Sequence, residues 1–152
     1  HDNSKYPKLC CQGVNTLRAF CDPLACPQSI IMLHSQSILE MAWTMLSRRG
    51  ESDVPVFLLE ECVPLIGNVA IIDRDSFAHH YTNFMGVLSS ILLTNSSSQG
   101  NLQELRGKCL ECCALMGTAM GYDVFHADAA QLLDFMVALQ SDADQFDVSD
   151  PS

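Results

Sequence analysis

The fold is decided by the stretch Glu61–Gly67, ECVPLIG, which nearly recurs about fifty positions later at Glu111–Gly117 as ECCALMG. Four of the seven positions are identical, and both copies lie inside long stretches of apolar periodicity. A period of about 40–50 residues that contains two helices is typical of a helical solenoid. Solenoids commonly present an extended surface to other macromolecules.

Apolar residues at three- and four-residue steps predict six helices along the chain. Their expected ranges are residues 6–20, 28–48, 55–72, 76–94, 102–120 and 124–140. Phe77 follows the first repeated glycine, and Phe125 follows the second, each at the opening of a further apolar helix. The short connections between the third and fourth helices, and between the fifth and sixth, predict antiparallel helix hairpins. We therefore expect an all-α superhelix of about three helix pairs.

Local signals refine these helices. Pro64 falls inside the third helix, where it removes one backbone hydrogen bond and is expected to bend the rod. Asp73, Asp75 and Ser76 are candidate N-caps for the fourth helix. Asp123 is a candidate cap for the sixth, and Gly121 is a natural stop for the fifth. Residues 141–152 contain four aspartates and no basic residue, which predicts an acidic loop or tail.

The charge balance limits the partners of this chain. Its 152 residues include 18 acidic and 8 basic side chains, giving a net charge of -10. Such a chain repels nucleic acid and anionic membranes and favours basic partners, although acidity equally accounts for solubility. Apolar residues make up 48% of the chain, enough for a sizeable core. No uninterrupted apolar run of about 18 residues predicts a membrane span.

The eight cysteines are interpreted as core residues. Most of them lie at helical core spacing, where a free thiol behaves as a small hydrophobic group. Cys109, Cys112 and Cys113 share one apolar helix, whereas a zinc site needs four ligands, usually held by loops. No nucleophile, base and orienting group occur together, and no phosphate-binding glycine loop is present. We therefore expect no enzyme activity, metal or cofactor; a thiol-dependent or zinc-binding helical protein is one alternative.

Residues 105–117, LRGKCLECCALMG, resemble the HEAT-repeat nuclear transport receptors of the importin-β superfamily, and the importin β-3 branch in particular. The resemblance extends from about Leu58 to Pro151, and it includes Phe77 and Phe125 in successive repeats. It departs from the family pattern in the high cysteine content, in Pro64 and in the serine-rich loop at residues 95–100. Because the first residue is His1, we expect a piece of a longer protein.

The resemblance implies an architecture and a function. The first, third and fifth helices would lie on the concave side, and the second, fourth and sixth on the convex side. Both ends would expose faces that neighbouring repeats cover. The whole receptor would bind cargo with basic import signals and release it when Ran-GTP binds. It would also contact Phe-Gly repeats of the nuclear pore and shuttle between cytoplasm and nucleus. A HEAT-repeat scaffold without a transport role is the alternative.

Four acidic residues are the candidate cargo-binding residues: Glu60, Glu61, Glu104 and Glu111. All four fall on the helices that the resemblance assigns to the concave side. Carboxylates there could accept charge-assisted hydrogen bonds from lysine or arginine side chains. The competing interpretation is a solvated polar face, which every amphipathic helix has. Glu61 and Glu111 occupy the same position of the repeated stretch, and they could instead point into the packing between repeats.

Overall fold

The computed structural model describes residues 7–22, 24–94 and 102–147, and this part of the chain is helical almost throughout. It contains seven helices, so the prediction of an all-α superhelix is confirmed. Their bounds are α1 Pro7–Phe20, α2 Gln28–Ser47, α3 Val56–Ile72, α4 Arg74–Ala78, α5 Tyr81–Leu93, α6 Gln103–Met120 and α7 Tyr122–Asp147. None of these helices is long and apolar enough to cross a membrane. The predicted loop at residues 95–100 lies outside the described residues.

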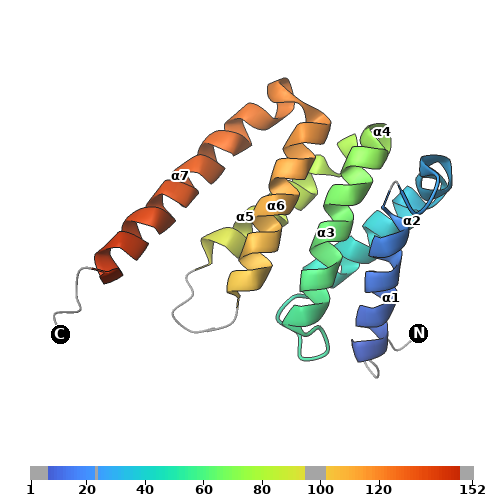
Figure 1. Cartoon of the computed structure of the whole chain (residues 1–152), viewed down its shortest axis with the longest axis horizontal. Helices are drawn as coiled ribbons and strands as arrows, with labels where there is room; N and C mark the ends of the chain where they lie inside the picture. Colours follow the sequence, from blue (N-terminus) through green and yellow to red (C-terminus); the bar gives the residue numbers. More distant parts are fainter. Residues whose placement is uncertain (1–6, 23, 95–101, 148–152) are drawn as a thin grey trace.

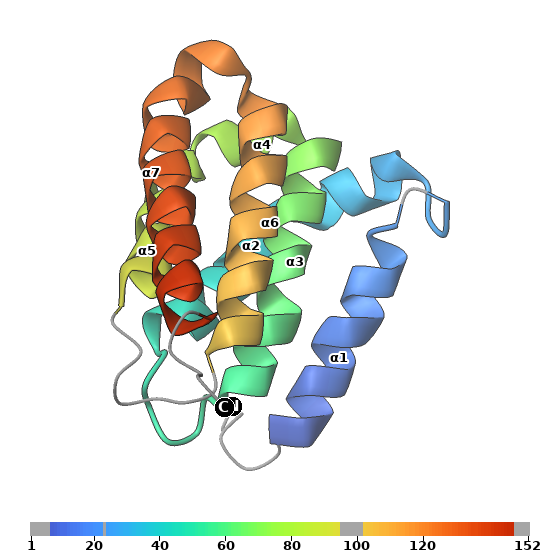
Figure 2. The same cartoon turned by 60° about the vertical axis from the view of Figure 1, so that its left-hand side comes forward.

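The helices form two layers. Helices α1, α3 and α6 stand side by side and run in the same direction, and we call them the first layer (Figure 1). Helices α2, α4, α5 and α7 form the second layer, in which α2 packs on α3 and α5 packs on α6 (Figure 2). First-layer and second-layer helices therefore alternate along the chain, and α2 and α5 each pack on the first-layer helix that follows them. This alternation is the arrangement of a HEAT-like solenoid.

Helix α3 is the centre of the structure because α1 packs on one flank and α6 on the other. Its sequence is apolar on almost every side, as expected for a helix that is covered all round. Leu65, Ile66 and Val69 are fully buried. The equivalent stretch of α6 buries Met116 in the place of Ile66 and Ala119 in the place of Val69, whereas Leu115, in the place of Leu65, is half-buried. The two copies of the repeated stretch thus lie in adjacent, parallel helices with matching inward faces.

Two of the expected helix boundaries are confirmed by the backbone. The Asp73 carboxylate accepts a hydrogen bond from the Ser76 backbone N–H at 3.3 Å, so Asp73 is the N-cap of α4. Gly121 has a φ of 84°, a left-handed conformation that glycine adopts without strain, and it ends α6. Helix α3 continues through Pro64 without a break.

The prediction of a single helix over residues 76–94 is wrong. The structure has two helices there, α4 and α5, separated by a turn at His79 and His80. No proline or glycine marks the break. The turn is closed by a hydrogen bond of 2.8 Å from the His80 N–H to the Phe77 carbonyl. It allows Phe77 and Phe84 to stack in one core, with ring centroids 6.1 Å apart, so tertiary packing overrides the local pattern.

The last helix is longer than the range of 124–140 expected from the sequence. Helix α7 begins at Tyr122, so Asp123 lies in its first turn instead of capping it. It continues to Asp147, and the prediction of a loop is therefore wrong for residues 141–147. Residues 148–152 lie outside the described residues. The sequence contains no helix-breaking residue before Pro151, and the aspartates alone do not end the helix.

Helix α7 is only partly covered. One stripe, which includes Phe125, Leu132 and Phe135, packs against the core. A second apolar stripe is exposed to solvent: the exposed fraction is 60% for Leu133 and 66% for Val137. In Figure 1 the C-terminal half of α7 leans away from α6. This end of the structure therefore leaves an apolar helix face uncovered.

Candidate functional site

The four predicted glutamates lie in the first layer, two on α3 and two on α6, and we call this surface the acidic face. Its centre is Lys108 of α6. The Lys108 ammonium lies 3.4 Å from a Glu104 carboxylate oxygen and 3.9 Å from a Glu61 carboxylate oxygen. Because α3 and α6 are adjacent and parallel, side chains from the two repeats meet across the groove between the helices.

Glu61 is compensated by the protein itself. Its second carboxylate oxygen lies 3.3 Å from a guanidinium nitrogen of Arg18, which comes from α1. This contact is an ion pair without hydrogen-bond geometry, and the same oxygen is buried and makes no hydrogen bond. Two cations from the helices on either side, Arg18 and Lys108, therefore face one carboxylate. Glu61 is held between repeats, as one of the two interpretations from the sequence expected.

Glu60 has a different electrostatic environment. Burial raises the pKa of its carboxyl group, and the negative charges of Glu104 and Glu61 add to the increase, while Lys108 partly opposes it. Glu60 makes no ion pair among the described residues. A carboxylate whose ionised form is disfavoured by burial and by like charges is stabilised when a cation approaches. The surroundings of Glu60 therefore favour an added positive charge.

Glu111 is exposed at the edge of a shallow depression that spans all three first-layer helices. Its volume is about 570 Å³, and its lining includes both signs of charge. The lining residues are Asn15, Arg18, Ala19, Asp22, Pro64, Asn68, Lys108 and Glu111. The sequence pattern did not indicate Asn15 or Asp22, which belong to α1 and the turn after it, nor Asn68, which follows the first copy of the repeated stretch on α3. The depression offers carboxylates and amides to an extended ligand.

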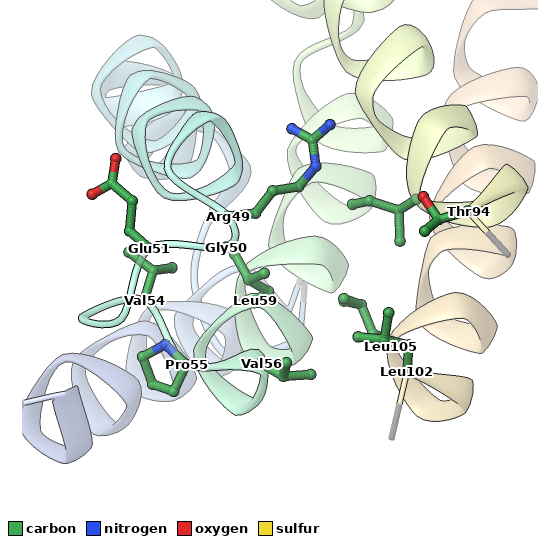
Figure 3. Close-up of a pocket in the computed structure, with 11 residues that line it drawn as sticks. Arg49, Gly50, Glu51, Val54, Pro55, Val56, Leu59, Thr94, Leu102 and Leu105 are labelled. Carbon is green, nitrogen blue, oxygen red and sulfur yellow. The ribbon is translucent and has the colours of Figure 1, made fainter. Parts of the chain in front are cut away.

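A second cavity, of about 490 Å³, lies where the α2–α3 connection meets the end of α5 and the start of α6 (Figure 3). Its wall is mostly apolar and includes Val54, Leu59 and Leu105. Figure 3 shows the Arg49 side chain extending toward α5, where its guanidinium donates a 2.9 Å hydrogen bond to the Ser90 hydroxyl. None of the four predicted glutamates lines this cavity. The cavity and the acidic face are separate features.

Five of the eight cysteines are buried in the core, and Cys10, Cys11 and Cys26 are partly exposed. Cys62, Cys109, Cys112 and Cys113 are buried, and none of the eight cysteines forms a disulfide. Burial raises the pKa of Cys62, Cys109 and Cys113 to about 12. A thiol with such a pKa contains almost no thiolate at neutral pH and is a poor nucleophile. Within the described residues, no three histidine, cysteine, aspartate or glutamate side chains are grouped so as to hold a metal ion.

The fold defines a class of helical repeat protein, a HEAT-like solenoid. Two known proteins are similar to this chain in sequence. The chain is 32% identical over 93 residues to importin subunit beta-3 of Saccharomyces cerevisiae, which covers 60% of this chain. It is 33% identical over 66 residues, 43% of this chain, to the probable importin-5 homolog of Dictyostelium discoideum. Over these residues the chain is similar to importin-β proteins, and its two-layer helical arrangement is consistent with a HEAT-like solenoid.

The matches cover a small part of each relative. The chain spans 8% of the length of the yeast protein and 6% of the Dictyostelium protein. No family model and no solved structure matches the chain. The similarity therefore concerns one short segment of much longer importins.

Proposed function

We propose that this chain forms part of a nuclear transport receptor and that its acidic face receives the basic import signals of cargo proteins. The observation that carries this proposal is the environment of Glu60. Its half-buried carboxylate lies near two other carboxylates, and its pKa is raised by burial and by their charges. A lysine or arginine side chain placed there would relieve this repulsion and form charge-assisted hydrogen bonds.

The four candidate residues take different roles in this proposal. Glu60 and Glu104 form the pair that most favours an incoming cation, and Glu111 extends the surface into the depression between helices. Glu61 holds Arg18 and Lys108 in place, and so keeps the surface in register. The net charge of -10 adds a long-range attraction for basic segments. Binding, and not catalysis, is the proposed mechanism.

The test is a binding titration of a fluorescein-labelled, lysine- and arginine-rich import-signal peptide by fluorescence anisotropy at low salt. Glu60→Lys and Glu111→Lys are each expected to weaken binding by about five- to tenfold. Asp134→Lys is the matched control, because it makes the same change of charge at an exposed position on α7. An equal loss of affinity in all three variants would show that only the net charge matters. Unchanged affinity in Glu60→Lys and Glu111→Lys would show that the acidic face is not the binding surface.

The whole receptor would release cargo on binding Ran-GTP, contact Phe-Gly repeats through its outer helices, and move between cytoplasm and nucleus. A change in solenoid curvature would couple cargo and Ran-GTP, since each ligand favours different shapes of the same structure. A pull-down of cargo by the full-length receptor, with and without Ran-GTP, separates this function from that of a HEAT-repeat scaffold. If the receptor retained all of its cargo in the presence of Ran-GTP, the result would support the alternative function, a HEAT-repeat scaffold without a transport role.

A further inference from the structure

The second layer has a hollow of its own, between α2 and α5, on helices that carry none of the four acidic-face residues. Its volume is about 340 Å³, and we call it the outer hollow. The lining residues are Leu39, Glu40, Trp43, Thr44, His80, Asn83 and Phe84. Polar groups make up a large part of its rim, which distinguishes it from a purely apolar groove between helices.

The aromatic wall of the outer hollow is Trp43, the only tryptophan in the chain. Trp43 meets Phe84 edge to face, with ring centroids 5.7 Å apart and planes at 86°. Phe84 is 1% exposed and belongs to the core, whereas Trp43 is 40% exposed. The core therefore fixes the indole ring in position from one side, while the hollow leaves much of its surface open.

A carboxylate stands one helical turn from this ring. Glu40 accepts a 2.8 Å hydrogen bond from the amide nitrogen of Gln36. The amide oxygen of Gln36 lies 3.0 Å from Nε2 of His80, and it accepts a hydrogen bond from that ring nitrogen. This chain of hydrogen bonds links α2 to the turn before α5 and orients Glu40. Among the described residues Glu40 makes no ion pair, in contrast to Glu61.

We propose that the outer hollow binds an arginine side chain of a protein partner. A guanidinium group stacks on an indole face and pairs with a carboxylate at the same time, because it is planar, delocalised and always charged. Trp43 supplies the face and Glu40 supplies the carboxylate. The amide of Asn83 and the hydroxyl of Thr44 add polar contacts at the rim. The site is a second surface for basic partners, and it does not depend on the acidic face.

The single tryptophan provides a direct measurement. The indole N–H resonance of Trp43 in the ¹⁵N-labelled chain is followed while N-acetyl-arginine amide, N-acetyl-phenylalanine amide or the neutral N-acetyl-glutamine amide is added. We expect a saturable shift with the arginine derivative and an affinity at least about threefold weaker for the other two. Glu40→Gln should weaken arginine binding by a similar factor, whereas Asp134→Asn, at an exposed position on α7, should leave it unchanged.

Several outcomes would overturn the proposal. One is a linear, non-saturating shift with the arginine derivative, and another is equal affinity of the wild type and Glu40→Gln. Tighter binding of the phenylalanine derivative would identify the hollow as a pocket for aromatic side chains instead. Glu40 is exposed, so the fold of Glu40→Gln is checked by an unchanged circular dichroism spectrum. Because the probe reports on Trp43, the result is independent of peptide binding at Glu60.

Discussion

A Cβ atom on Gly117 would lie 2.4 Å from the ring of Phe125, so this glycine is what allows α6 and α7 to approach. Gly117→Ala must displace a bulky aromatic ring that packs against the core. We expect a loss of about 1–3 kcal/mol in the free energy of unfolding, the usual cost of overpacking. Urea denaturation followed by circular dichroism measures this change.

Gly107→Ala in the same helix is the matched control for that substitution. A Cβ atom on Gly107 would meet no other atom within 4 Å. Alanine should therefore stabilise the helix by about 0.5–1 kcal/mol, through helix propensity alone. Stabilisation by both substitutions would show that the contact between Gly117 and Phe125 does not constrain the packing of α7.

The hydroxyl group of Tyr81 donates a 2.6 Å hydrogen bond to the Asp128 carboxylate and so links α5 to α7. Tyr81→Phe leaves the ring in place and removes only this bond. Since the acceptor is charged, we expect a loss of about 1–2 kcal/mol in the free energy of unfolding. Tyr122→Phe, at an 81% exposed position, should change stability by less than about 0.5 kcal/mol. Similar losses in the two variants would contradict a specific role for Tyr81.

Asp73 should contribute to the acid sensitivity of the fold. Burial opposes ionisation of this carboxyl group, but hydrogen bonds from Ser35 and Ser76 outweigh burial and lower its pKa below the ordinary 3.8. A lowered pKa stabilises the folded state above the ordinary pKa, and this contribution is lost as the pH falls through the folded-state value. Asp73→Asn keeps a capping oxygen and removes the titration.

The expected result is a less stable Asp73→Asn variant at pH 6, by about 0.5–1 kcal/mol, and a smaller difference from wild type at pH 3. Urea denaturation at the two pH values gives both differences. A difference that grows on acidification would have the wrong sign for a lowered pKa and would contradict this assignment.

The thiols should react in two groups. Cys10, Cys11 and Cys26 are partly exposed, whereas the other five are buried. In the native protein, a thiol reagent such as dithiobis(nitrobenzoate) should modify the partly exposed group first, and the buried group at least about tenfold more slowly. All eight should react rapidly in denaturant. Rapid native-state reaction of Cys112 would contradict its burial in the core.

The sequence predicts the fold well because helical periodicity and the internal repeat point to the same structure. The stripe of Leu58, Cys62 and Ile66 is buried as expected. The errors occur where local signals were weak or misleading. The turn at His79 and His80 depends on the stacking of Phe77 with Phe84, a contact that no local pattern encodes. The extension of α7 shows that aspartates alone do not stop a helix.

The candidate site could be predicted only in part. Spacing places Glu60, Glu61, Glu104 and Glu111 on first-layer helices, but it does not show which of them is already paired. The pairing of Glu61 depends on Arg18, which comes from a helix without the repeated stretch. The outer hollow was also missed, because Glu40 and Trp43 look like ordinary surface residues until α5 packs beside them.

Glu61 sits on the middle one of three parallel rods and is bridged to each neighbour by a cation, Arg18 on one side and Lys108 on the other. If these three helices move apart or closer together, the distances of both ion pairs change at the same time. Each such pair contributes only about 0.2–1 kcal/mol and weakens with added salt. The stiffness of this stretch of superhelix should therefore fall as ionic strength rises, which makes the surrounding electrolyte a regulator of how far it flexes.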